Sequence, residues 1–216
     1  MKKFIILILM PVLILCISCS GDERGIDIGE TTVSVSLKET EEAPPDIMYA
    51  ARDMYIIFDS LTRAMEYYDM PYSDSDPEFM WRALTILFNY CNEGEPVDDG
   101  IRATAELIGD YMSACFNRKT KIPQITDYIE YNPESMIYKI PIMVDFIYDD
   151  YTVEVGDILN NGDGTYTAYI NYINNSDGSI VEQYIFTLID NPYAGKNDES
   201  ANIMLYSVVG VAVLIM

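Results

Sequence analysis

The sequence contains no histidine, and this absence excludes several kinds of active site. Ser-His-Asp and Cys-His catalysis both need an imidazole, and so do the histidine-containing zinc sites. The chain also lacks a Gly-rich phosphate loop and a nucleophile elbow. We therefore expect no metal, no cofactor and no catalytic residue, and these absences favour a binding role over an enzymatic one.

Positive charge is also scarce. The 216 residues include 13 lysines and arginines against 35 aspartates and glutamates, which gives a formal net charge of −22 at pH 7. Such a surface repels phosphate backbones and anionic lipid head groups, which argues against nucleic acid as a partner. It would accept cationic partners or divalent ions, and it also suits a soluble protein in an extracytoplasmic setting.

The first residues follow the three-part plan of an export signal. Lys2 and Lys3 supply positive charge, the apolar run Phe4 to Leu15 follows, and small and polar residues come next. The 12 residues of this run would span roughly 18 Å as a helix, against about 30 Å for the hydrocarbon core of a bilayer. We therefore expect an export signal rather than a membrane-spanning helix.

The segment Cys16-Ile17-Ser18-Cys19 resembles the bacterial lipobox, in which a small residue precedes the cysteine that is lipidated. Cys19 fits this pattern because Ser18 precedes it, whereas Leu15 precedes Cys16. The sequence departs from the family at Cys16, where lipoboxes usually carry leucine. A plain cleaved signal peptide is the alternative interpretation.

The resemblance implies that residues 1–18 are a signal peptide and that Cys19 carries a diacylglyceryl group with acyl chains such as palmitate. Each buried methylene contributes about 0.8 kcal/mol, and two or more chains give stable attachment to a membrane. The acidic stretch 20–23 is similar to the segment after the cysteine in surface-exported lipoproteins of Bacteroidetes. We therefore expect a protein of the bacterial cell envelope, lipid-anchored to a membrane, with the outer-membrane surface as one location.

Only Cys91 and Cys115 would remain after cleavage and lipidation, which is too few for a cysteine-built zinc site. They could form one disulfide in an oxidising compartment. Two buried thiols on neighbouring helices are the alternative.

Residues 19–45 are acidic and polar and end in two prolines, which predicts a tether between the lipid and a single folded domain, 46–216. Three helices are predicted between residues 46 and 118. The first is capped by Asp46, the second begins at Asp76-Pro77, and the third spans Asp99 to Asn117. Trp81 lies early in the second helix, where it could stand at the mouth of a ligand pocket or pack in the core.

From residue 128 the hydrophobic period changes from helical to two, which predicts a sheet over 128–216. A hairpin turns at 132–135, and further turns at Asn161-Gly162-Asp163-Gly164 and Asn175-Ser176-Asp177-Gly178 predict an antiparallel meander. The apolar segment Ile203 to Met216 predicts a last strand, buried on both faces and bent near Gly210.

The predicted fold is α+β: three N-terminal helices on one face of an antiparallel meander of five to six strands. This order of elements resembles the cystatin-like and nuclear transport factor 2-like group of curved-sheet domains, and the resemblance implies a fold only.

The 18 tyrosines are the most unusual feature of the composition. Tyrosine faces beside carboxylates can bind sugars, and carboxylate pairs can hydrolyse them, but packing on apolar faces also accounts for the tyrosines. The sequence favours a non-catalytic binding or assembly module with an envelope protein or a saccharide as partner. The alternatives are a carboxylate-based hydrolase or carbohydrate-binding protein with a tyrosine-lined cleft, and a subunit that offers a sheet edge to a partner.

Overall fold

The computed structural model describes residues 41–90, 93–119, 121–143, 150–194 and 204–214. This described part contains four helices: α1 (Pro45–Arg52), α2 (Tyr55–Tyr68), α3 (Pro77–Tyr90) and α4 (Ala105–Phe116). Its strands are β1 (Glu41–Glu42), β2 (Glu95–Val97), β3 (Gly100–Thr104), β4 (Glu130–Asn132), β5 (Ile137–Ile140), β6 (Tyr151–Asn160), β7 (Thr165–Asn174), β8 (Ile180–Asp190) and β9 (Tyr206–Leu214). The α+β class is confirmed. The predicted three helices and single sheet are wrong in number, because four helices and two antiparallel sheets are present among these residues.

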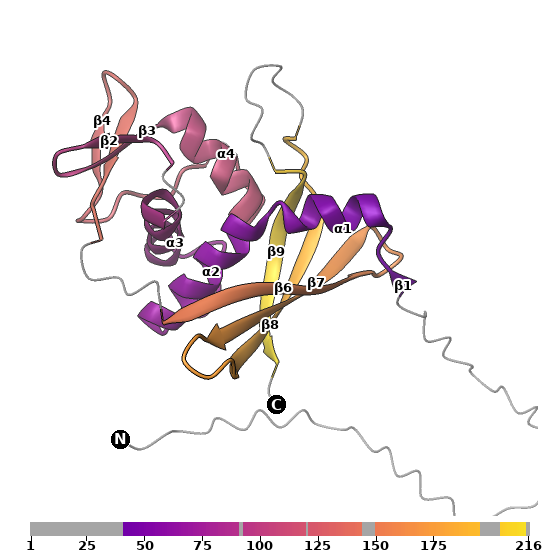
Figure 1. Cartoon of the computed structure of the whole chain (residues 1–216). Helices are drawn as coiled ribbons and strands as arrows, with labels where there is room; N and C mark the ends of the chain where they lie inside the picture. The colour runs from indigo at the N-terminus through magenta and orange to yellow at the C-terminus, as the bar shows by residue number, and fades with distance from the viewer. Residues whose placement is uncertain (1–40, 91–92, 120, 144–149, 195–203, 215–216) are drawn as a thin grey trace, which may run out of the picture. The chain divides into compact units, whose positions relative to one another are not determined.

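The larger sheet has the strand order β1-β6-β7-β8-β9, in which β6 to β9 are long and β1 is a two-residue pairing at the edge (Figure 1). Strands β6 to β9 form the predicted antiparallel meander. The turns work as expected because Gly162, Gly164 and Gly178 adopt positive φ angles of 69°, 89° and 72°. Two residues near the end of the predicted tether belong to the sheet, because Glu41–Glu42 pairs with β6.

Helix α2 lies across one face of this sheet. Phe58 of α2 and Phe186 of β8 meet edge to face, with ring centroids 5.1 Å apart. The sequence predicted one helix after Asp46, but the chain turns between α1 and α2. Asp46 is not the cap, because Pro44 occupies the N-cap position and α1 begins at Pro45.

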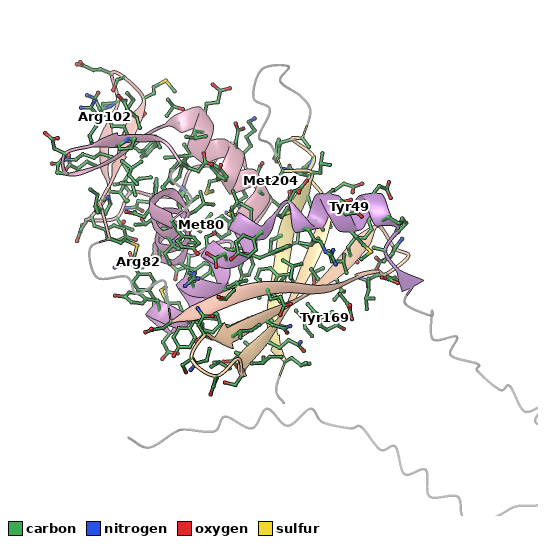
Figure 2. All side chains as sticks on the ribbon, viewed as in Figure 1. Tyr49, Met80, Arg82, Arg102, Tyr169 and Met204 are labelled. Carbon is green, nitrogen blue, oxygen red and sulfur yellow. The ribbon has the colours of Figure 1, made fainter. Side chains whose placement is uncertain are left out.

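Helix α3 is buried along most of its length, and its buried residues are Phe79, Met80, Trp81, Ala83, Leu84, Thr85, Ile86, Leu87 and Phe88. The Asp76 carboxylate accepts a hydrogen bond from the amide of Glu78 at 3.0 Å, which caps the first turn as predicted. Arg82, labelled in Figure 2, lies on the outer side of α3 with its guanidinium carbon 4.5 Å from the Tyr68 ring and 4.2 Å from the Tyr128 ring. These stacking contacts tie α3 to α2 and to the segment before β4.

A second sheet has the strand order β2-β3-β5-β4. The prediction of a single sheet and of a third helix beginning at Asp99 was therefore wrong. Residues 100–104 form β3, and α4 begins only at Ala105 because the Thr104 hydroxyl caps it by accepting from the amide of Leu107 at 3.1 Å. The predicted hairpin between residues 128 and 142 is present as β4 and β5. It pairs with β3 and not with the meander, so it belongs to the second sheet.

Strand β9 confirms that the apolar C-terminal segment is part of the larger sheet, where it pairs antiparallel with β8. A register shift near Gly210 matches the predicted bend. Burial on both faces was wrong: Tyr206, Ser207 and Val208 are buried, whereas residues 212–214 are exposed. The reason is that α4 packs against β9 but covers only part of its length (Figure 1).

Within the described ranges, no helix has the length and apolar character needed to cross a membrane.

Candidate functional site

The residues singled out from the sequence lie in different parts of the molecule. Trp81 is fully buried in α3, where its indole N–H donates to the carbonyl of Gln124 at 3.1 Å. Cys115 is fully buried in α4, while Cys91 and Cys19 lie outside the described residues. The disulfide between Cys91 and Cys115 and the lipidation of Cys19 therefore stay predictions.

A pocket of about 400 Å³ lies between the C-terminal end of α2 and the ends of β8 and β9. Its apolar wall consists of five side chains: Met65, Met70, Pro71, Val211 and Val213. The wall forms where the C-terminal end of α2 and the residues after it meet Val211 and Val213 of β9. Methionine adapts its shape readily, which suits a wall that contacts a ligand.

The polar side of the same pocket is acidic. Glu66 comes from the last turn of α2, and Asp69 follows as its C-cap in the left-handed conformation, with φ of 52°. Glu182 and Tyr184 lie two residues apart on β8, so both side chains point to the helix-covered face of the sheet. The four side chains thus converge because a helix end and one face of a strand meet there.

A hydrogen bond joins two of these groups. The Tyr184 hydroxyl donates to Glu66 Oε1, and burial raises the pKa of Tyr184, so the phenol keeps its proton. Burial, and then the nearby Glu66 carboxylate, raises the pKa of Glu182. A positively charged ligand would offset the repulsion between these two acidic groups.

The pocket floor is held by a second tyrosine. The Tyr72 hydroxyl donates a shared hydrogen bond to two carbonyl oxygens, that of Cys115 at 3.0 Å and that of Val208 at 3.3 Å. Burial raises the pKa of Tyr72, so this donor also stays protonated. The contact fixes the loop after α2 against α4 and β9, which keeps the pocket in shape.

The residues that line the pocket indicate which ligands it can bind. Lysine and arginine are absent from the described residues that line it, so Glu66, Asp69 and Glu182 face no internal cation there. Carboxylates without an opposing charge favour an ammonium or guanidinium group, and the apolar wall favours a carbon stem attached to it. Elsewhere in the described residues, too, no three acidic or sulfur side chains gather closely enough to hold a metal ion.

Comparison with known proteins found no matching family model, no similar curated protein and no similar solved structure.

Sequence reasoning missed the pocket, although one signal was present. Glu182 alternates with the buried residues Tyr184, Phe186 and Leu188, which places a carboxylate on the inward face of a strand. A charged group at such a position is uncommon and points to a functional role. The partner of Glu182 could not be inferred, because Glu66 lies on a distant helix.

Proposed function

We propose that this chain is a lipid-anchored extracytoplasmic binding module, and that its ligand carries a positively charged group into the pocket between α2, β8 and β9. One observation carries the proposal: Glu66, which accepts a hydrogen bond from Tyr184, and Glu182 line one pocket beside an apolar wall, with no cation among the described lining residues. A carboxylate pair that served only to stabilise the fold would be expected to face a buried cation.

The anchor is the part of the proposal that the sequence supports. Lys2 and Lys3, the apolar run and Ser18-Cys19 have the order of a lipoprotein signal. An anchored binding module needs no catalytic group, which is consistent with a chain that contains no histidine. The pocket belongs to the folded part of the chain, so lipidation and ligand binding can be tested separately.

The test compares a small amine with its uncharged analogue. n-Butylamine and n-butanol have the same carbon stem, and thermal unfolding of the full-length protein in detergent reports binding of either one. A ligand at ten times its Kd stabilises by about 1.4 kcal/mol, which corresponds to roughly 3–6 °C in Tm for a chain of this size. We expect this shift with n-butylamine and not with n-butanol.

Variants locate the effect. Glu66→Gln and Glu182→Gln remove one charge each and should abolish the shift, whereas Glu154→Gln changes an exposed glutamate of β6 and should keep it. Equal shifts with both ligands, or in all three variants, would contradict the proposal. Stabilisation by neutral methyl glycosides but not by amines would favour a saccharide ligand in the same pocket.

A further inference from the structure

Strand β9 forms one edge of the larger sheet, and its two halves differ at that edge. The first half is covered, because the Tyr72 hydroxyl bonds to the carbonyl of Val208 and α4 packs against the strand. Beyond the register shift, no strand among the described residues pairs with the outer edge of 210–214. Figure 1 shows this half of β9, in yellow, extending past α4 along the margin of the sheet.

The open half of this edge carries no charged residue and no proline. Natural edge strands often carry one or the other, which prevents another strand from adding to them. In residues 210–214 both are absent, and Val213 and Leu214 are exposed by 45% and 36%. At the opposite margin of the sheet, β1 pairs only with residues 159 and 160 of β6, and the rest of β6 carries Glu154 and Asp157. An uncharged edge on a chain with a net charge of −22 therefore indicates a surface kept for a partner strand.

The open edge and the acidic pocket adjoin each other. Val211 and Val213 belong to the open half of β9, and their side chains also line the pocket. A strand added along 210–214 would place alternate side chains on the pocket side of the sheet. A side chain with a long apolar stem and a cationic end would then run along the valines toward Glu66 and Glu182.

We propose that residues 210–214 of β9 bind an extended segment of a partner polypeptide by strand addition, and that a lysine or arginine of this segment enters the acidic pocket. The inference rests on the proposed function for the pocket and adds the class of partner. Backbone hydrogen bonds along β9 supply affinity, and the pocket supplies specificity for the cationic side chain. The negative charge of the chain also attracts a basic partner.

A second copy of the chain is a poorer occupant. Two β9 strands could pair through their open edges, but the strand Tyr206–Leu214 contains no lysine or arginine. Such a dimer would leave the carboxylates of Glu66 and Glu182 without a cationic partner.

The test uses a labelled, blocked peptide, Ser-Val-Thr-Lys-Thr-Val-Ser, in which lysine and both valines fall on one face of an extended strand. Its binding to the full-length protein in detergent is measured by fluorescence anisotropy. Replacing lysine by norleucine should weaken binding at least tenfold, and Glu182→Gln should weaken binding of the lysine peptide by a similar factor. Glu154→Gln is the matched control and should leave binding unchanged.

Two further peptides test strand addition itself. Each carries N-methyl groups on alternate residues, in one frame or the other, and only one frame faces the edge of β9. Loss of binding in one frame, together with slower hydrogen exchange within residues 210–214, supports the proposal. Equal binding of both N-methylated peptides, or no binding of the parent peptide, overturns it.

The outcomes separate the two proposals. If n-butylamine binds but the peptide does not, the pocket is functional and strand addition is wrong. If neither binds, the proposed function fails as well. A dimer in solution whose β9 amides are protected without peptide would also overturn the inference, because the edge would then be occupied by a second copy.

Discussion

A buried ion pair within α2 allows a quantitative prediction. Arg63 and Asp59 of α2 are 2% and 0% exposed, and Arg63 Nε donates to both carboxylate oxygens of Asp59, at 2.9 and 3.0 Å. A terminal nitrogen of Arg63 also donates to the carbonyl of Tyr151 at 3.0 Å, which joins α2 to β6. Glu66 lies one turn further along the same helix, so this pair positions the acidic side of the pocket.

Removing one partner should be far more costly than removing both. Asp59→Asn leaves the Arg63 guanidinium buried without its counter-charge, and we expect a loss of about 3–5 kcal/mol in the free energy of unfolding. This loss is a large share of the roughly 5–15 kcal/mol typical of a domain. Asp59→Leu combined with Arg63→Met removes both charges, and its main cost is the orphaned Tyr151 carbonyl, about 1–3 kcal/mol. The double variant should therefore be more stable than Asp59→Asn.

Urea unfolding followed by circular dichroism measures these differences, because the slope of the transition also reports whether the unfolded state has changed. The matched control is Glu78→Gln, which breaks the ion pair between Glu78 and Arg82. These two residues are also four positions apart, but their side chains are 41% and 31% exposed. That change should cost less than about 1 kcal/mol. If Asp59→Asn costs no more than the control, or if the double variant is the least stable, burial is not what makes this ion pair important.

Three further predictions concern the anchor, the pocket and the last strand. Cys19→Ala should abolish lipid labelling and release the protein from membranes, and labelling that is lost instead in Cys16→Ala would show that the other cysteine is modified. The folded-state pKa of Glu182 is raised above the ordinary value of 4.5, so the stability that its protonated form contributes is present below that value and lost as pH rises through the raised pKa. The unfolding free energy of the wild type should therefore fall relative to Glu182→Gln over that pH range, and parallel pH profiles would refute this. Truncation before Ile203 removes β9, whose buried side chains, such as Val208, contribute about 1.5–3 kcal/mol each. The product should be sensitive to protease, whereas a retained cooperative melting transition would show that β9 is dispensable.

Local patterns in the sequence determined the elements that depend only on near neighbours. Asp76 and Pro77 set the start of α3, and glycines with positive φ angles set the turns of the meander. The alternation in β7 and β8 was visible because each strand buries one face. These features were predictable because capping, turn geometry and side-chain period act over a few residues.

Distant partners decided the rest of the fold. Residues 100–104 could be read as the beginning of a helix, and they form β3 because residues 137–140 pair with them in a second sheet. In the same way, the division of the predicted first helix into α1 and α2 follows from how the two segments pack on β6 and the meander. Pairing of this kind depends on which strand is available, and no local period contains that information.

The tertiary structure also created the candidate site. Tyr184 and Glu66 are 118 residues apart in the chain and share a hydrogen bond because α2 crosses the end of β8. The sequence by itself determined that carboxylates and tyrosines are abundant and cations are few, which predicts that nucleic acid is not a partner. Only the packing of one helix end against two strands decided which carboxylates meet, because a pocket is formed by surfaces that the chain brings together from afar.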